Sequence, residues 1–339
     1  MNEPITVSVS CTTYNHAPYI RKCFEGFLMQ KTTFSFEVLV HDDASTDGTR
    51  EIIEEYVVKY PNLFFPIYQT KNQYSKGVRG IMAKFNFSRC RGKYIALCEG
   101  DDYWQDPMKL QKQVDFMEQN PDFSGIHHKV LYVDKEGSLL GESDRVLSDY
   151  FIASYEDLVQ GNMIHTCSFL FNTKSLKYQG EYIWKLSHDF HDIYLFLSVA
   201  LSGKIKYSDE VMATYRRGVG VMQAYTKKGL LDEADRYLNF FIDTWDLTTQ
   251  QKAYTYLRLS TVFLSYAEIL AEERDTTRAK VLIKKFWQAF FKYKQNIRFR
   301  KNKRLTIKFR KIIKVYLFTF LPRLANRIII YRSKYSHTI

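Results

Sequence analysis

Three carboxylates stand close together in the segment LCEGDDYWQDP, which covers residues 97–107. Glu99, Asp101 and Asp102 follow directly on an apolar run, and their mutual repulsion is costly unless a positive group lies among them. A helix N-terminus or a divalent cation usually supplies that group. The chemistry of this segment depends on whether the acids interact with a helix N-terminus or bind a cation.

The helix explanation fails on position. The next helix start lies several residues further on and has its own acid, because Asp106 and Pro107 are typical of the N-cap and first position of a helix over 108–120. A hard cation such as Mg²⁺ or Mn²⁺ takes one or two carboxylates together with phosphate oxygens of a substrate. We therefore expect a metal site here, with surface salt bridges of Glu99 and Asp102 as the alternative for those two acids.

A second pair of acids ends another apolar segment, in HDDASTDGT over residues 41–49. Turn chemistry and a helix start explain the second half of this motif, but they do not require two acids at a strand end. A carboxylate there can accept a hydrogen bond from the N3–H of a uracil, while the ring of Tyr14 from a neighbouring strand end covers the base. We favour Asp43 over Asp42 for this contact.

The first hundred residues alternate strand-like and helix-like segments, which favours βαβ units and a largely parallel sheet. The carboxyl ends of parallel strands collect ligands. The polar residues after the first strand and the two acid motifs should therefore meet at one edge of the sheet. The expected strands are 6–12, 36–41, 63–69 and 93–98, and the expected helices are 17–29, 49–59 and 81–89.

Strand signals become sparser after residue 120. The segment VLYVDKEGSLL over 130–140 is typical of a hairpin, and the pattern over 165–171 favours a strand. A helix is expected from Asp192 to about residue 201. From Lys227 onward the pattern predicts helices without strands.

The totals describe an ordinary globular chain. Its 339 residues are 45% hydrophobic and 25% charged. A chain of this length is expected to form about two domains. No signal-peptide pattern and no apolar stretch of membrane-spanning length occurs, so we expect a cytoplasmic protein. Five cysteines without a CxxC pair favour reduced core thiols over a zinc site. Phosphate loops of the GxxxxGK and GxGxxG types are absent, which argues against an NTPase or a dehydrogenase.

The net charge of +12 is unevenly distributed. Residues 276–339 contain 19 Lys and Arg and no acid, so all 37 acidic residues precede them. Only this tail has the excess of positive charge that favours a polyanionic partner. Its apolar residues line one helical face over 279–294, and its apolar stretch 312–322 falls short of the ~20 residues that span a bilayer.

Basic faces alternating with Trp, Phe, Leu and Ile fit an anchor on an anionic membrane surface. A solvated charge run on helices that pack against the rest of the chain is the alternative. No recognisable RNA or DNA module occurs in the tail, so we expect no specific nucleic-acid partner.

Four motifs together resemble one known family. The segments VSCTTYNHAPYI, FEVLVHDDASTDGT, GKYIALCEGDDYW and HDIYLFLSVALSGKIKYSDEVMATYR resemble the family 2 inverting glycosyltransferases of the GT-A fold, especially those that build bacterial capsule, O-antigen and exopolysaccharide. The resemblance covers roughly residues 4–221, and the order of the motifs makes it specific. It implies an α/β GT-A (nucleotide-diphospho-sugar transferase) fold with a mostly parallel central sheet, followed by a helical basic C-terminal region.

The resemblance also implies roles for individual residues. Thr12, Tyr14 and Asp43 would hold the nucleoside of a nucleotide-sugar. Glu99 and Asp101 occupy the family's DxD positions, with Asp101 as the direct ligand of Mn²⁺ or Mg²⁺. Because Glu99 replaces the commoner Asp, its contact could run through water or to the ribose.

Two further residues match positions of the family's donor and acceptor sites. Lys84 stands where the family often places a base near the diphosphate. The acid that deprotonates the acceptor hydroxyl is usually at the start of a later helix, and Asp192 matches that place. One carboxylate opposite the leaving UDP, together with a metal, is sufficient for inversion. A plain N-cap role for Asp192, and Asp189 as a rival base, are the alternatives.

One position departs from the family pattern. Many relatives have a histidine two residues after the Tyr-Arg pair that completes the metal and diphosphate site, whereas Gly218 stands there in this chain. Arg216 and Arg217 could carry the phosphate charge instead, and His188 or His191 could substitute. A lone histidine in such a region is more often structural, so neither is assigned to the metal.

These observations predict a GT-A catalytic domain over 1–225 and a helical region over 226–339, whose basic membrane-association tail covers about 276–339. The expected reaction moves a sugar from a nucleotide-sugar donor, a UDP-sugar, to a lipid-linked oligosaccharide acceptor in surface polysaccharide biosynthesis. Two alternatives stay open: a non-catalytic nucleotide-sugar-binding scaffold of a synthase complex, and a transferase that uses a polyprenyl phosphate. A homo-oligomer through the helical region is also open.

Overall fold

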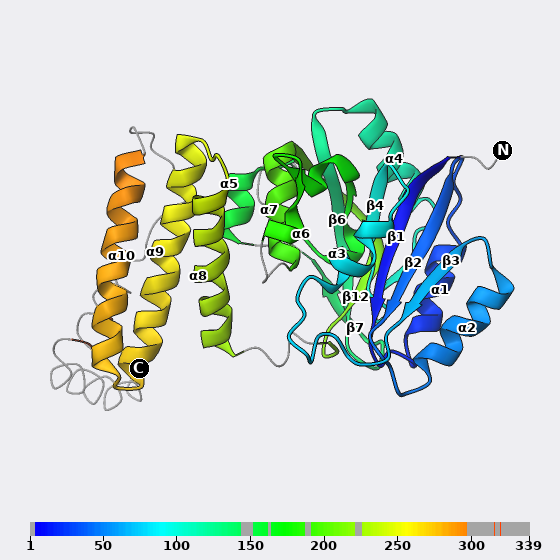
Figure 1. Cartoon of the computed structure of the whole chain (residues 1–339), viewed down its shortest axis with the longest axis horizontal. Coiled ribbons are helices and arrows are strands. Elements are labelled where there is room, and N and C mark those ends of the chain that lie inside the picture. Colours follow the sequence, from blue (N-terminus) through cyan, green and yellow to red (C-terminus); the bar gives the residue numbers. More distant parts are fainter. Residues whose placement is uncertain are drawn as a thin grey trace, which may run out of the picture. The chain divides into compact units, whose positions relative to one another are not determined.

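The computed structural model describes residues 4–143, 152–161, 164–186, 191–220 and 226–296, and the single positions 315 and 319. By its internal contacts the chain divides into two units, residues 1–223 and 224–339. The first unit contains the sheet and the second contains three long helices (Figure 1).

One mixed sheet forms the centre of the first unit (Figure 1). Its strands are β1 Ile5–Thr13, β2 Ser35–Asp42, β3 Phe64–Tyr68, β4 Tyr94–Leu97, β5 Tyr103–Trp104, β6 Phe123–Val133, β7 Leu139–Glu142, β8 Ile152–Ala153, β9 Leu170–Asn172 and β12 Lys204–Arg216. The order is β3-β2-β1-β4-β9-β6-β12-β5, with β7 beside β6 and β8 beside β12. The first four of these strands are parallel, as are β6 and β12, whereas β9 runs antiparallel between β4 and β6.

Helices cover both faces of this sheet. The helices and 3₁₀ turns of the unit are α1 Ile20–Leu28, α2 Thr49–Lys59, α3 Ile81–Phe85, η1 Phe87–Arg89, α4 Lys109–Gln119, α5 Tyr155–Gln160, η2 Thr166–Ser168, η3 Thr173–Leu176, α6 Ile183–Leu186 and α7 Asp192–Ser202. A short hairpin, β10 Lys177–Tyr178 and β11 Glu181–Tyr182, lies outside the main sheet. Apolar residues of α1, α2 and α4 join those of β1, β2 and β4 in one buried cluster.

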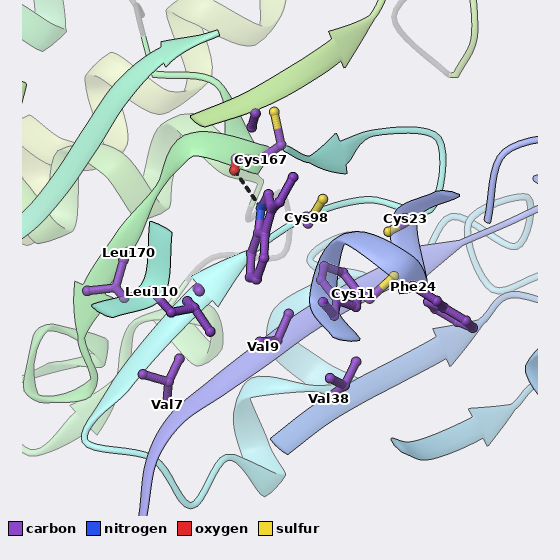
Figure 2. Close-up of a cluster of buried hydrophobic side chains, with 14 of the residues drawn as sticks. Val7, Val9, Cys11, Cys23, Phe24, Val38, Cys98, Leu110, Cys167 and Leu170 are labelled. Carbon is purple, nitrogen blue, oxygen red and sulfur yellow. Dashed lines mark hydrogen bonds between the residues drawn. The ribbon is translucent and has the colours of Figure 1, made fainter. Parts of the chain in front are cut away.

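β1 is buried on both faces, which is typical of a central parallel strand. Val7, Val9 and Cys11 lie on the side of α1, where Figure 2 shows Cys11 near Cys23. The alternate residues are serines, and Ser10 accepts a hydrogen bond from the Asn86 amide at 3.1 Å. Polar side chains on this second face are therefore paired, as burial requires.

In the part of the second unit that the structure describes, the helices are α8 Lys227–Thr244, α9 Thr249–Glu272 and α10 Thr276–Asn296. α9 packs against both α8 and α10. Thr248 caps α9 in a reciprocal pair of hydrogen bonds with Gln251, which satisfies two backbone donors at the helix start. Among the helices that the structure describes, none is long and apolar enough to cross a bilayer.

Several element boundaries differ from the expectations. The N-cap of α4 is Met108, so the expectation of Asp106 as N-cap is wrong; Asp106 instead accepts the Met108 N–H at 2.8 Å and pairs with Lys112. The expected strand over 165–171 begins as the 3₁₀ turn η2 and continues as β9. β12 carries register shifts around Val211, which interrupt the alternation that normally identifies a strand.

Candidate functional site

Three strand ends meet at one edge of the sheet, as the sequence predicts. β1 lies between β2 and β4 and runs parallel to both. Beyond the ladders, the Asp43 N–H donates to the Thr13 carbonyl and the Gly100 N–H donates to the Thr12 carbonyl, each at 3.0 Å. The polar residues after β1 therefore lie beside both acid motifs.

The loops after β1 and β2 are tied together by side chains. Asn15, which has a left-handed backbone with φ 54°, accepts from the Thr46 N–H at 2.9 Å. The other bonds run from the main-chain N–H groups of the first loop to side chains of the second: Asn15 to Ser45, His16 to Thr49, and Ala17 to Asp47. The second half of HDDASTDGT thus holds the loop in place, whereas the Tyr14 ring stays 45% exposed at the edge.

The two acids at the end of β2 have different partners. Asp42 accepts a hydrogen bond from the Ser45 hydroxyl within its own loop. Asp43 accepts the main-chain N–H groups of Gln73 at 2.8 Å and Tyr74 at 3.1 Å. A carboxylate has about four lone-pair positions, so Asp43 keeps acceptor capacity after these two bonds.

The three acids after β4 also differ in their surroundings. Asp102 is buried and accepts the Arg216 N–H at 2.7 Å, and burial raises its pKa well above the ordinary range. Glu99 accepts the hydroxyl of Thr166 in η2. Burial, followed by the negative charge of Asp192, raises the pKa of Glu99 to about 8. The Asp102 carboxylate thus binds a main-chain N–H group. The Glu99 carboxyl is instead influenced by the charges of Asp192 and Asp101.

Asp192 is the first residue of α7 and is exposed. The N-cap of this helix is His191, so a plain N-cap role for Asp192 is wrong. Because the negative charge of Asp192 acts on Glu99, the start of α7 lies near the edge where β4 ends. The rival base Asp189, and His188, lie outside the described residues.

Arg216 connects the acid motif to the rest of the fold. Its guanidinium donates to the Asp101 carbonyl at 3.0 Å and to the Asp134 carbonyl at 2.9 Å, and it lies 4.4 Å from the centre of the Tyr19 ring. The residue is nearly buried. Its hydrogen bonds therefore go to the main chain, and the suggestion that it carries phosphate charge does not fit. Arg217 is exposed and stacks on Tyr132.

Lys84 lies on α3 with an exposed side chain. Across the described ranges its ammonium group makes no hydrogen bond or ion pair. Thr12, Tyr14, Asp43, Glu99, Asp101 and Asp192 are thus linked to one edge by the contacts above, whereas no contact of the structure links Lys84 to them.

The donors at this edge suit a cation that also binds substrate. Within the described residues, no group of three or more His, Cys, Asp or Glu side chains could hold a metal ion. Glu99 and Asp101 supply two carboxylates, and Nε2 of His16 lies 3.9 Å from Oδ2 of Asp101. Such a donor set fits an ion that completes its shell with phosphate oxygens. Sequence reasoning missed His16 and Thr166, although both lie inside segments that it quoted.

Comparison with known proteins identifies the family and the fold. The family model described as "Glycosyl transferase family 2" matches residues 8–178. The chain is 38% identical over 213 residues to the uncharacterized protein Rv1520 of Mycobacterium tuberculosis, an alignment that covers 62% of this chain and 58% of that protein. It is 28% identical to the UDP-Glc:alpha-D-GlcNAc-diphosphoundecaprenol beta-1,3-glucosyltransferase WfaP of Escherichia coli, over 68% of this chain and 84% of that protein.

Two solved structures share the fold. TarS 1-349 of S. aureus, in complex with UDP-GlcNAc, superposes with a TM-score of 0.58 at 15% identity, covering 87% of this chain and 93% of that one. The mannosyltransferase PcManGT of Pyrobaculum calidifontis, in complex with GDP-Man and Mn²⁺, gives 0.52 at 14% identity, covering 87% and 88%. The expected α/β GT-A fold, followed by a helical region, is confirmed. Because the family model matches half of its length, this chain belongs to glycosyl transferase family 2.

Proposed function

We propose that the chain transfers one sugar from a nucleotide-sugar, a UDP-sugar, to a lipid-linked glycan in surface polysaccharide biosynthesis, with inversion at the anomeric carbon. The observation that carries this proposal is the common edge at which β1, β2 and β4 end and to which the charge of Asp192 reaches. Family membership supports it, and so does the name of WfaP, which gives UDP-Glc as donor and a diphosphoundecaprenol-linked sugar as acceptor.

The nucleoside would bind at the ends of β1 and β2. The exposed Tyr14 ring can cover a flat base, and Asp43 retains lone pairs that can accept from a base N–H group. Thr12 pairs with His41, one residue before the end of the ladder between β1 and β2. Lys84 would approach the diphosphate, since its exposed and unpaired ammonium is free to move toward a negative ligand.

Glu99 and Asp101 would hold a divalent cation, Mn²⁺ or Mg²⁺. A cation bound there stabilises the negative charge that develops on the departing diphosphate. Arg216 fixes the main chain at Asp101, so the carboxylate is oriented before the ligand arrives. The Mn²⁺ in the PcManGT complex supports a cation of this kind.

Asp192 would take the proton from the acceptor hydroxyl. Its exposed position at the start of α7 leaves room for an acceptor, and its carboxylate lies within electrostatic range of Glu99. A single positioned carboxylate can supply general-base assistance of roughly 10²–10⁴-fold. The attacking oxygen then approaches from the face opposite the diphosphate, which inverts the anomeric carbon.

The helical region would place the enzyme at the inner face of the cytoplasmic membrane as a peripheral protein. α10 contains no acidic residue and exposes Val281 and Phe291 beside Lys284. Apolar side chains among lysines suit the interface of an anionic bilayer. A peripheral position would bring the enzyme to the membrane that contains a lipid-linked acceptor.

A thermal-shift series with the full chain tests the donor site. A ligand that binds only the folded state raises the melting temperature, so UDP, UDP-sugars and GDP-mannose are compared with and without Mn²⁺. We expect stabilisation by the uridine nucleotides that depends on metal, and loss of this metal-dependent part in Asp101→Asn. Asp122→Asn, an exposed acid in the turn before β6, is the matched control and should respond like the unmodified chain.

Transfer to an acceptor lipid, followed by mass spectrometry, separates the remaining alternatives. Metal-dependent UDP binding without sugar transfer and without slow donor hydrolysis would favour the scaffold function. A product with one sugar on polyprenyl phosphate would identify that lipid as the acceptor. No response to any nucleotide, from a folded sample, would contradict the proposed donor site.

A further inference from the structure

A histidine stands beside the acid motif at the edge where the strands end. His16 follows β1, and its Nε2 lies 3.9 Å from Oδ2 of Asp101, with both side chains only 11% exposed. We propose that His16 and Asp101 bind the divalent cation together, with the imidazole as a direct ligand. This inference rests on the proposed function, because it concerns the cation expected at Asp101.

The separation of the two atoms suits a shared ion. At 3.9 Å, Nε2 and Oδ2 are too far apart for a hydrogen bond. Two donors that each lie about 2.1 Å from one octahedral ion are about 3.0 Å apart when adjacent and about 4.2 Å apart when opposite. The observed separation falls between these limits, so small side-chain movements bring both atoms onto one ion.

The main chain holds the imidazole of His16 in place, and one ring nitrogen has no hydrogen bond. The His16 main-chain N–H donates to the Thr49 hydroxyl at 2.9 Å, and its carbonyl accepts the N–H groups that begin α1. Its Nδ1 is buried and, within the described part of the chain, makes no hydrogen bond. The nitrogen that faces Asp101 is the other one, Nε2. When Nδ1 carries the ring proton, the lone pair of Nε2 is available to a cation.

The residue between the two acids of the motif makes room for this ring. A Cβ at Gly100 would lie 3.0 Å from Nδ1 of His16 and 2.7 Å from the hydroxyl oxygen of Thr13. A side chain at residue 100 would therefore force Thr13 or the imidazole to shift. Glycine at this position lets the ring of His16 lie against the backbone of the acid motif.

A nitrogen ligand has a consequence for metal choice. Carboxylate and water oxygens suit Mg²⁺, whereas imidazole shifts preference toward transition-metal ions. A site built from Asp101, His16 and diphosphate oxygens should therefore bind Mn²⁺ in preference to Mg²⁺. An all-oxygen site of the same shape should discriminate less.

Pulsed electron paramagnetic resonance of Mn²⁺ bound to the full chain with UDP tests the assignment directly. A coordinated imidazole produces nitrogen modulation of the electron spin echo, which Mn²⁺–UDP alone lacks. We expect this modulation in the unmodified chain and in His41→Gln, which removes a buried histidine at the end of β2. It should disappear in His16→Gln, with Mn²⁺ binding weakened at least about tenfold.

A second variant separates loss of the ligand from loss of the fold. His16→Asp replaces the nitrogen donor with an oxygen donor, so it should restore Mn²⁺ binding without nitrogen modulation and reduce the preference for Mn²⁺ over Mg²⁺. Nitrogen modulation that persists in His16→Gln would overturn the assignment while leaving the metal-dependent function intact. Failure of the unmodified chain to bind Mn²⁺ with UDP would overturn both.

Discussion

The carboxylate of Asp192, at the start of α7, lies near enough to Glu99 for its negative charge to raise the pKa of the Glu99 carboxyl. The two acids come from distant parts of the sequence, the end of β4 and the start of α7. They therefore form one electrostatic unit, in which a positive charge near Glu99 also acts on Asp192. In the proposed function, donor binding near Glu99 and acceptor activation at Asp192 would therefore influence each other.

Asp192→Asn should slow sugar transfer far more than it changes donor binding. The amide keeps the shape of the side chain but cannot take a proton, so we expect kcat to fall by roughly 10²–10⁴-fold. Donor affinity should change much less, through the loss of one negative charge near Glu99. Release of UDP in the presence of acceptor measures the rate, and a nucleotide titration measures the affinity. If Asp189→Asn causes this loss and Asp192→Asn does not, the base is Asp189.

Arg216→Met should destabilise the first unit and weaken cation binding. The substitution leaves the buried carbonyl of Asp101 and the partly buried carbonyl of Asp134 without this donor, at a cost of about 3 kcal/mol in the free energy of unfolding. Urea denaturation measures this cost, and a Mn²⁺ titration measures the affinity. Arg217→Met, which removes an exposed guanidinium stacked on Tyr132, is the matched control and should cost less than about 1 kcal/mol. Equal effects of the two substitutions would contradict a positioning role for Arg216.

Lys109→Met should change how stability depends on pH. The Lys109 ammonium is fully buried, donates to Gln113 at 2.7 Å and lies over Trp104, and burial lowers its pKa to about 7. Between pH 7 and about 10.4, the unfolded chain holds a proton that the folded chain has released. The free energy of unfolding therefore rises with pH across this window, by at most about 1.4 kcal/mol per unit.

Methionine removes this contribution, so the advantage of Lys109→Met over the unmodified chain should be largest near pH 7 and shrink toward pH 10. Loss of the donor to Gln113 adds a cost that does not vary with pH. Urea midpoints at several pH values measure the difference. Lys112→Met, which removes an exposed lysine one turn further along α4, should leave the slope in this window unchanged. Parallel curves for Lys109→Met and the unmodified chain would contradict the assignment.

Removing apolar side chains from α10 should weaken membrane binding. Val281 and Phe291 are 56% and 60% exposed, and burying them in a bilayer interface would contribute enough free energy to change partitioning about tenfold. Sedimentation of the full chain with phosphatidylglycerol vesicles compares the Val281→Ser, Phe291→Ser double variant with Val58→Ser. Val58 on α2 is 82% exposed and serves as the control.

Binding through a basic surface should also decrease with salt and be weaker to phosphatidylcholine vesicles. Unchanged partitioning of the double variant, or equal binding to neutral vesicles, would show that α10 does not contact the membrane. The charge of the tail would then serve another polyanion or remain solvated.

The order of the first elements could be predicted from the sequence because local signals agree there. α2 has the expected bounds, Thr49–Lys59, since Gly48 takes a left-handed backbone with φ 97° immediately before it. The polar ends of β1, β2 and β4 meet because parallel strands place their carboxyl ends at the same edge. The roles of these residues, which rest partly on strand-end chemistry and partly on the family resemblance, stay predictions.

Contacts between distant segments could not be predicted in the same way. The approach of His16 to Asp101 depends on the loop that Asn15 and Asp47 hold together, and no periodicity encodes such a contact. Arg216 looked like a phosphate ligand because its charge is visible in the sequence, whereas its burial is not. β12 was missed because the irregularity at Val211 and the acids before it interrupt the strand pattern.

The buried cysteines allow local opening of the first unit to be measured by thiol labelling. Cys11, Cys23 and Cys98 lie close together, and Cys167 lies near them (Figure 2). Cys98 directly precedes Glu99, the first acid of the motif. Burial raises the pKa of Cys98 to about 12, so a maleimide can modify this thiol only when the surrounding structure opens. Under native conditions, the labelling rate of Cys98 therefore measures the free energy of opening beneath the donor site. Slower labelling with nucleotide and metal would follow ligand binding without any assay of sugar transfer.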